Sequence, residues 1–187
     1  MSTELFLVLD ADAAPGGERA ALSEMSDVVW VADPATAATI AADGVRSGVR
    51  LIELYGGFGL TGARQVIRAV DGRAPVGVAG HLAPPSGSSA VLIEDDTADP
   101  TTDRLVRRHP DGSRTSVIRV PRAAMAGIAA AEVGDGAVRV ELCGGTALVT
   151  AADVVDRVGP DADIALVTWP FESIRGAAAY AASFASA

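Results

Sequence analysis

Hydrophobic residues in the first half of the chain fall into short apolar runs separated by segments with helical periodicity. Such runs, bounded by polar or glycine-rich segments, predict buried β-strands. The predicted strands are Leu5–Asp10, Val28–Val31, Arg50–Leu54 and Val76–Ala79.

The segments between these runs predict three helices. Glu18–Met25 has weak helical character. Asp33 followed by Pro34 predicts a helix start, because aspartate caps free N–H groups and proline suits the first helical position. The helix after them has an apolar stripe at helical spacing, from Ala37 to Val45. A third helix is predicted to open at Thr61 or a neighbouring residue.

The second half repeats this pattern. Its predicted strands are Ala90–Glu94, Thr115–Val120, Val138–Leu142 and Asp163–Val167, and its predicted helices are Arg122–Val133, Ala151–Val158 and Phe171–Phe184. In the charged segment Asp95–Arg114, the Pro-Asp-Gly turn favours a hairpin, with a helix from Pro100 to His109 as the alternative.

The two halves also share residues. When Ala38–Val70 is compared with Ala126–Val158, without a gap, 14 of 33 positions are identical. The shared residues include ELYGG, Glu53–Gly57, which returns as ELCGG, Glu141–Gly145. The chain is therefore interpreted as a tandem duplication.

Alternating strands and helices predict an α/β fold with parallel sheets. We expect two similar βαβαβαβ repeats, flavodoxin- or Rossmann-like units about a pseudo-twofold axis. The alternative is a compact eight-stranded (βα) barrel made of two half-barrels. The expected domains are repeat one, residues 1–80, a linker, residues 81–89, and repeat two with an extra C-terminal helix, residues 90–187.

Composition excludes several classes of function. A net charge of -9 argues against nucleic acid and membranes as partners, and no apolar run is long enough to predict a spanning helix. The chain has no lysine, which excludes Schiff-base chemistry. Two histidines and one cysteine cannot form a His₃ or Cys₄ zinc site, whereas a hard cation bound by carboxylates stays possible. We expect no metal and no cofactor. The single cysteine and the lack of a secretion signal favour the cytoplasm.

The repeated motif supplies the main candidate site. Strand periodicity puts Glu53 and Tyr55 on one face near the carboxyl end of a parallel strand, where ligands bind in α/β sheets. A buried glutamate there could act as a general acid or base, or it could hydrogen-bond the turn or an arginine of the other copy. The candidate catalytic residues are Glu53, His81, Asp10 and Glu141, and the candidate ligand- or anion-binding residues are Tyr55, Gly56, Gly57, Gly59 and Thr61.

The stretch LIELYGGFG, Leu51–Gly59, together with APVGVAG, resembles a bacterial family of small uncharacterised α/β proteins with an ELCGGFG-type motif. Copy two keeps ELCGG but reads Thr-Ala-Leu where the motif has Phe-Gly. The resemblance implies the domain limits and a cytosolic setting. It implies no activity.

Three functions follow from these residues. The first is a cofactor-independent enzyme of isomerase, cyclase or lyase type, using carboxylate or histidine proton transfer on an anionic or carbonyl-containing metabolite. The second is a ligand-binding or accessory module without catalysis. The third is a structural or partner-binding protein. A small-molecule ligand is expected under the first two, and a homodimer remains open.

Overall fold

The computed structural model describes residues 2–184, which divide into two compact units. Unit 1 contains the chain up to Pro84 and resumes at Val167, and unit 2 is Pro85–Leu166. The last part of the predicted second domain therefore belongs to unit 1. No helix among the described residues has the length and apolar character needed to cross a membrane.

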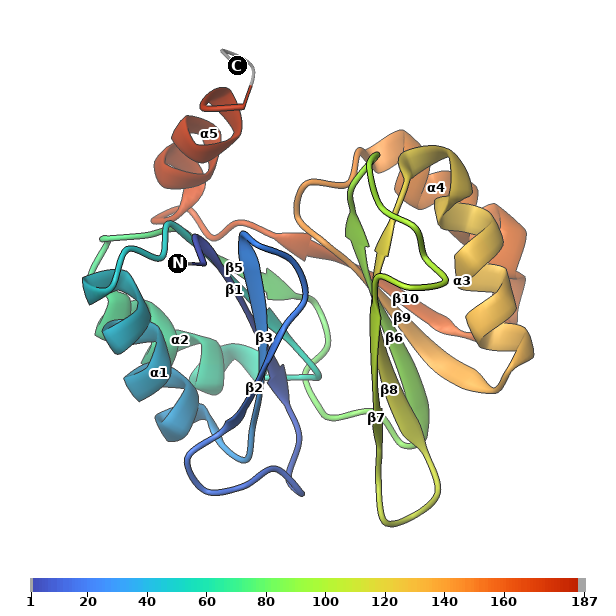
Figure 1. The fold of residues 1–187 in the computed structure, drawn as a ribbon, viewed down its shortest axis with the longest axis horizontal. Helices are drawn as coiled ribbons and strands as arrows, with labels where there is room; N and C mark the ends of the chain where they lie inside the picture. The colour runs from blue at the N-terminus through green and yellow to red at the C-terminus, as the bar shows by residue number, and fades with distance from the viewer. Residues whose placement is uncertain (1, 185–187) are drawn as a thin grey trace. The chain divides into compact units, whose positions relative to one another are not determined.

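Unit 1 is built on a mostly parallel sheet with two helices on one face (Figure 1). Its parallel strands run in the order β3, β1, β4, β5, and β2 adds an antiparallel edge next to β3. The elements are β1 (Glu4–Leu9), β2 (Glu18–Ala21), β3 (Ser26–Val31), α1 (Pro34–Arg46), β4 (Leu51–Tyr55), α2 (Gly59–Val70) and β5 (Val76–Ala79).

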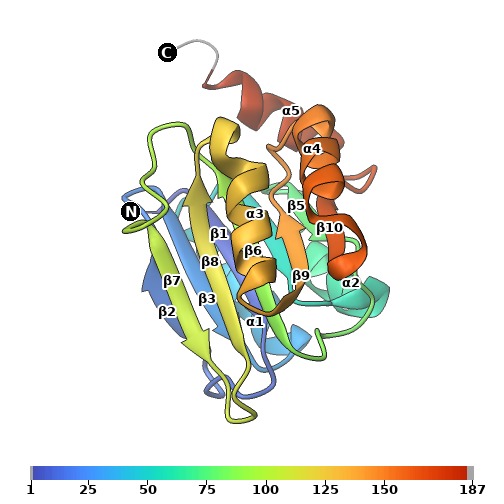
Figure 2. The same ribbon diagram turned by 90° about the vertical axis from the view of Figure 1, so that its right-hand side faces the viewer.

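Unit 2 repeats this order of elements, and in Figure 2 its two helices lie across the near face of its sheet. Its strands run β7, β8, β6, β9, β10, with β7 antiparallel at the edge. The elements are β6 (Ser88–Glu94), β7 (Arg104–Arg108), β8 (Arg114–Val120), a 3-10 turn η1 (Arg122–Ala124), α3 (Met125–Gly134), β9 (Ala137–Leu142), α4 (Leu148–Val158), a 3-10 turn η2 (Gly159–Asp161) and β10 (Asp163–Thr168).

The predicted βαβαβαβ order is wrong at its first crossover. Glu18–Met25 is not a helix: Glu18–Ala21 forms β2 and pairs antiparallel with β3. Arg19 and Asp27 stabilise this hairpin with an ion pair of 2.6 Å. A helix of eight residues gains little from its own hydrogen bonds, so pairing with the buried strand β3 prevails.

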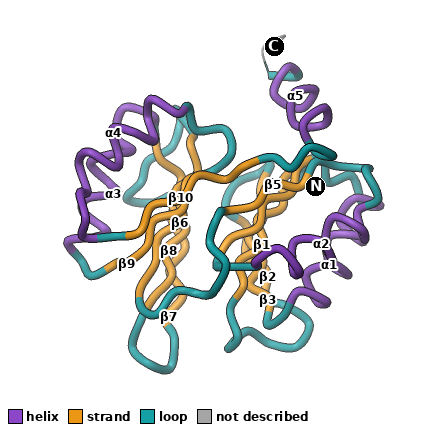
Figure 3. Tube along the Cα trace, turned by 180° about the vertical axis from the view of Figure 1, so that it is seen from behind, coloured by secondary structure: helices purple, strands orange, loops and turns teal. Residues whose placement is uncertain are grey.

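The hairpin preferred for the charged segment of copy two is confirmed. Strands β7 and β8 pair antiparallel around the turn that contains Gly112, and the alternative helix is absent from residues 100–109. In both copies, an antiparallel edge strand follows the first parallel strand in the sequence and forms a hairpin with the second parallel strand. In the tube drawing, α1 and α2 lie on one face of the sheet of unit 1, and α3 and α4 lie on one face of the sheet of unit 2 (Figure 3).

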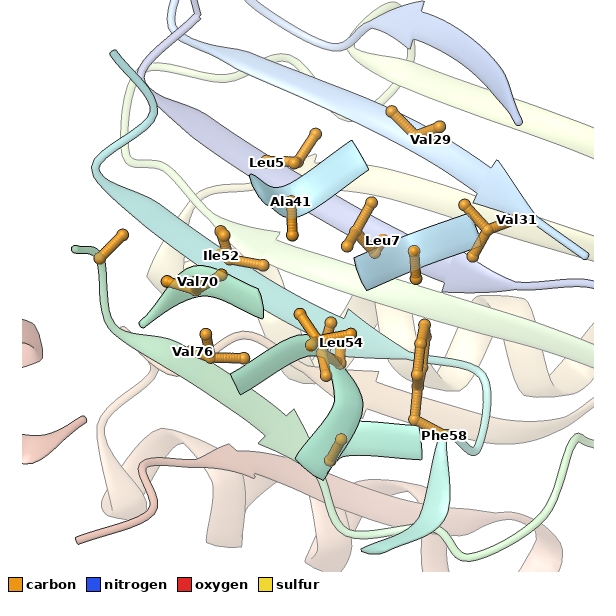
Figure 4. Packing of buried hydrophobic residues seen from close by; sticks show 14 of the residues in the cluster. Leu5, Leu7, Val29, Val31, Ala41, Ile52, Leu54, Phe58, Val70 and Val76 are labelled. Carbon is orange, nitrogen blue, oxygen red and sulfur yellow. The ribbon is translucent and has the colours of Figure 1, made fainter. Parts of the chain in front are cut away.

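The core of unit 1 lies between its sheet and its two helices (Figure 4). Leu5 and Leu7 of β1 and Ile52 and Leu54 of β4 project toward α1 and α2, which contribute small residues such as Ala41. Asp33 caps α1 by accepting hydrogen bonds from the second and third residues of the helix, as predicted. The core of unit 2 uses the matching positions, including Leu92, Val140 and Leu142.

The C-terminal segment joins unit 1 through several specific contacts. Val167 and Thr168, the end of β10, pair antiparallel with β5, and α5 (Ile174–Ala182) follows. The buried Ser173 hydroxyl accepts a hydrogen bond of 3.0 Å from the Val76 N–H. The Tyr180 hydroxyl donates to Glu4 at 2.8 Å. Burial and the Glu4 charge raise the pKa of Tyr180.

Candidate functional site

The two glutamates of the repeated motif are fully buried. Glu53 is 2 % exposed and Glu141 is 1 % exposed. Glu53 lies on the face of β4 opposite to Ile52 and Leu54, so it points away from α1 and α2. Its carboxylate accepts a hydrogen bond from the Tyr55 hydroxyl on the same face, as strand periodicity predicts. Glu53 is thus part of a packed sheet face.

Tyr55 is held on that face by aromatic packing. Its ring meets Phe6 of β1 edge to face, with 6.3 Å between ring centroids, and it is fully buried. Register explains the contact, because Tyr55 pairs with Val8 and Glu53 pairs with Phe6 on the neighbouring strand. Tyr55 was predicted to bind ligand, and its observed contacts are those of a core residue.

Asp10 closes a turn after β1. Its carboxylate accepts a hydrogen bond from the Asp12 N–H at 3.0 Å, and its own N–H donates to Val31 at 2.9 Å. Asp95 makes the same turn after β6, with Thr97 donating at 2.8 Å and Val120 accepting at 2.9 Å. Both aspartates therefore hold the turn that follows the first strand of their unit.

The glycine pair of the first copy lets two backbone segments approach closely. Gly56 and Gly57 have φ of +82° and +84°, values that favour glycine. A Cβ at Gly56 would lie 2.7 Å from the Leu9 carbonyl oxygen, and one at Gly57 would lie 2.0 Å from the Ala83 carbonyl oxygen. The close approach is therefore made by the chain itself, at the end of β1 and at the segment after β5.

Unit 1 contains a pocket of about 520 Å³. One wall is the outer face of α2, the second is the end of β5 with the turn after it, and the third is the segment after β10. Its lining residues are Gly59, Leu60, Ala63, Arg64, Ile67, Arg68, Val78, Ala79, Gly80, His81, Leu82, Thr168, Pro170 and Glu172. The size is that of a small-molecule site.

Charged side chains line this pocket without neutralising one another. Arg64 and Arg68 stand one turn apart on the exposed face of α2, and Glu172 lies in the segment after β10. Within residues 2–184, none of the three forms an ion pair or a side-chain hydrogen bond. Several arginines elsewhere, such as Arg104 and Arg119, are paired with carboxylates. The pocket therefore holds two cations and one anion that remain available to a ligand.

The structure brings together two of the predicted site residues. Gly59 and the buried His81 both line the pocket. Gly59 opens α2, whose start has no side-chain cap. Thr61 lies in the exposed first turn of the same helix but is not part of the lining. The remaining candidates lie outside the lining: Asp10, Glu53, Tyr55, Gly56, Gly57 and Glu141.

Sequence reasoning missed the three charged residues of the pocket. A signal for the arginines was present in the repeat. At the matched positions of copy two, Ala152 replaces Arg64 and Asp156 replaces Arg68. Trp169 likewise stands where copy one has His81. These differences fall at positions that line the pocket in copy one. Glu172 had no comparable signal, because its place in unit 1 depends on the C-terminal segment.

Cys143, the counterpart of Tyr55, is also structural. Its sulfur is buried, accepts a hydrogen bond from the Glu94 N–H at 3.2 Å and lies 3.3 Å from the Thr146 hydroxyl oxygen. A thiol held in this way stabilises the turn after β9.

These features belong to a duplicated α/β protein with a charged pocket in its first unit. Two segments of the chain, residues 2–90 and 87–182, match the family of unknown function DUF6506. The chain belongs to this family, in two consecutive copies, as the ELYGG and ELCGG motifs predicted. No curated protein and no solved structure matches it.

Proposed function

We propose that unit 1 binds a small anionic molecule in the pocket between α2, the end of β5 and the segment after β10. The observation that carries this proposal is the pair Arg64 and Arg68, which line a pocket of about 520 Å³ and have no anionic partner among the described residues. Arginine presents a planar set of donors that matches carboxylate and phosphate oxygens.

Two further features favour an anion. Gly59 at the start of α2 lines the pocket, and a helix N-terminus carries free N–H groups and a positive dipole end. The chain as a whole carries a net charge of -9, so two unpaired cations on one helix face oppose the general charge of the protein. Such a local reversal concentrates a small anion at the pocket.

Copy two lacks the two arginines, and this difference supports an anion site in unit 1. Its helix α4 carries Ala152 and Asp156 where α2 carries the arginines, so the matched face has lost two cations and gained an anion. We therefore expect one anion site in each chain, in unit 1.

An enzyme is the second candidate. His81 and Glu172 line the same pocket, and histidine and glutamate are residue types that serve as general acids and bases in enzymes. Glu53, the other main candidate for proton transfer, does not line the pocket. Isomerase, cyclase or lyase chemistry on the bound anion would then depend on His81.

The test is a thermal-shift screen with inorganic phosphate and a series of mono- and dicarboxylates. A ligand that binds the folded state raises the melting temperature by mass action. The double variant Arg64→Gln, Arg68→Gln should abolish the shift. Charge-assisted hydrogen bonds contribute about 1.5–3 kcal/mol each, so each arginine should account for roughly a 10- to 100-fold change in affinity.

The matched control is Arg157→Gln, which removes an exposed arginine from α4 in unit 2. This variant should respond to each ligand as the wild type does. An equal shift in the wild type and in the double variant would contradict the proposal, because the anion would then bind elsewhere.

A further inference from the structure

The pocket of unit 1 combines charges of both signs on separate walls. Arg64 and Arg68 come from α2, whereas Glu172 comes from the segment that follows β10. Oppositely charged side chains within 4.0 Å would form ion pairs, and among the described residues these three form none. More than 4.0 Å therefore separates the Glu172 carboxylate oxygens from the guanidinium nitrogens of both arginines.

The anionic wall has a defined backbone position. Ser173, next to Glu172, is buried, and its hydroxyl accepts the Val76 N–H at 3.0 Å. The Ser173 N–H donates to the Pro170 carbonyl at 2.8 Å. Thr168, another lining residue, pairs with Val78 of β5. Glu172 is therefore fixed relative to β5 although its side chain is exposed.

The walls that carry the charges also carry apolar residues. Leu60, Ala63 and Ile67 of α2 face the pocket together with Leu82 and Pro170. Leu60 and Leu82 are 81 % and 73 % exposed, so they offer apolar surface to a ligand. A ligand that fits this arrangement carries a carboxylate, a cationic group and a small apolar part.

We propose that the pocket takes a small zwitterion of the amino-acid type, with its carboxylate at Arg64 and Arg68 and its ammonium at Glu172. This inference rests on the proposed anion-binding function and specifies its ligand class. Glu172 is the specificity-determining residue, because a carboxylate faces an ammonium favourably and faces a second anionic group unfavourably. A dianion would keep the arginine contacts and meet repulsion at Glu172.

The experiment compares matched pairs of ligands by calorimetric titration of the full chain. Each pair consists of an amino acid and the same acid without its amino group: leucine with 4-methylpentanoate, valine with 3-methylbutanoate and alanine with propanoate. For at least one pair, the amino acid should bind about tenfold more tightly or better, the ratio expected for one charge-assisted contact at an exposed site.

Glu172→Gln should bring the affinity for that amino acid down to that of its partner acid, and leave the affinity for the partner acid unchanged or higher. The control Glu24→Gln removes an exposed carboxylate of unit 1 outside the pocket and should leave the ratio unchanged. Because Glu172 is exposed and has no partner within residues 2–184, thermal unfolding without ligand should be unaltered and serves as the check on folding.

Failure of the inference and failure of the proposed function give different results. If the acids without an amino group bind as tightly as the amino acids, and both need the arginines, anion binding stands and the zwitterion inference is overturned. The same inference is overturned if Glu172→Gln leaves the ratio unchanged. If binding of every ligand is insensitive to Arg64→Gln, Arg68→Gln, both proposals fall.

Discussion

Substitution of Gly57 by alanine tests whether the close backbone contact holds the pocket in place. Gly57 has φ of +84°, and an added Cβ would lie 2.0 Å from the Ala83 carbonyl oxygen, 2.2 Å from its carbon and 2.6 Å from the Pro84 nitrogen. All three are backbone atoms, so no side-chain rotation relieves the clash. The segment after β5, which lines the pocket, must move.

The expected loss of unfolding free energy in Gly57→Ala has two parts. A left-handed conformation costs an L-residue about 1–2 kcal/mol. Displacing a packed turn adds an overpacking cost of about 1–3 kcal/mol. Gly57→Ala should therefore lower the free energy of unfolding by roughly 2–5 kcal/mol, measured by urea denaturation with circular dichroism.

Two glycines serve as matched controls. Gly72 has φ of +69° and no atom within 4 Å of an added Cβ, so Gly72→Ala should show the conformational cost alone, about 1–2 kcal/mol. Gly145, the counterpart of Gly57 in copy two, has an added Cβ no closer than 4.0 Å to the Cys143 sulfur and no positive φ. Gly145→Ala should change stability by about 0.5 kcal/mol or less.

The test compares the losses of unfolding free energy in the three glycine variants. If Gly57→Ala costs no more than Gly72→Ala, the contact with Ala83 does not restrain the turn and the reasoning is refuted. An equally large loss in Gly145→Ala would refute the claim that the two copies use their glycines differently.

Three further outcomes follow from the cores and the titrating groups. Leu54→Ala and Leu142→Ala, at matched fully buried positions, should each cost about 2–5 kcal/mol of unfolding free energy in urea denaturation. The pKa of Asp95 is lowered: burial raises it, but hydrogen bonds from Thr97 and Arg119 outweigh burial. Asp95→Asn should therefore destabilise the protein at neutral pH, and the difference should vanish as pH falls through the lowered pKa. The pKa of Tyr180 is raised above its ordinary value of 10.0. The neutral hydroxyl therefore stabilises the folded state below about pH 10, and this stability is lost as the pH rises through the raised pKa. Tyr180→Phe should therefore lose less stability than the wild type at alkaline pH.

The strands and most helices were predictable because their signals are local. Apolar runs located β1, β3, β4 and β5, and the Asp33–Pro34 pair located the start of α1. The helix predicted over Glu18–Met25 failed because its strand state depends on pairing with β3. Such pairing is not visible in a window of eight residues.

The site was only partly predictable. Periodicity correctly placed Glu53 and Tyr55 on one face of β4, but it could not tell which face the helices cover. The glycines were predicted to bind a ligand or anion, and the close approach of Gly57 to the Ala83 backbone could not be predicted from the motif. The wall formed by Thr168, Pro170 and Glu172 arises from contacts distant in sequence. The arginines could have been predicted as candidates by comparing the two copies, because copy two has different residues at the matched positions.

The most direct test of the central claim is calorimetric titration of the wild type and of Arg64→Gln, Arg68→Gln with the best ligand from the anion screen. The account predicts one site for each chain in the wild type and a loss of affinity of roughly 100-fold or more in the double variant. Two equivalent sites in each chain, or the same affinity in both proteins, would contradict it.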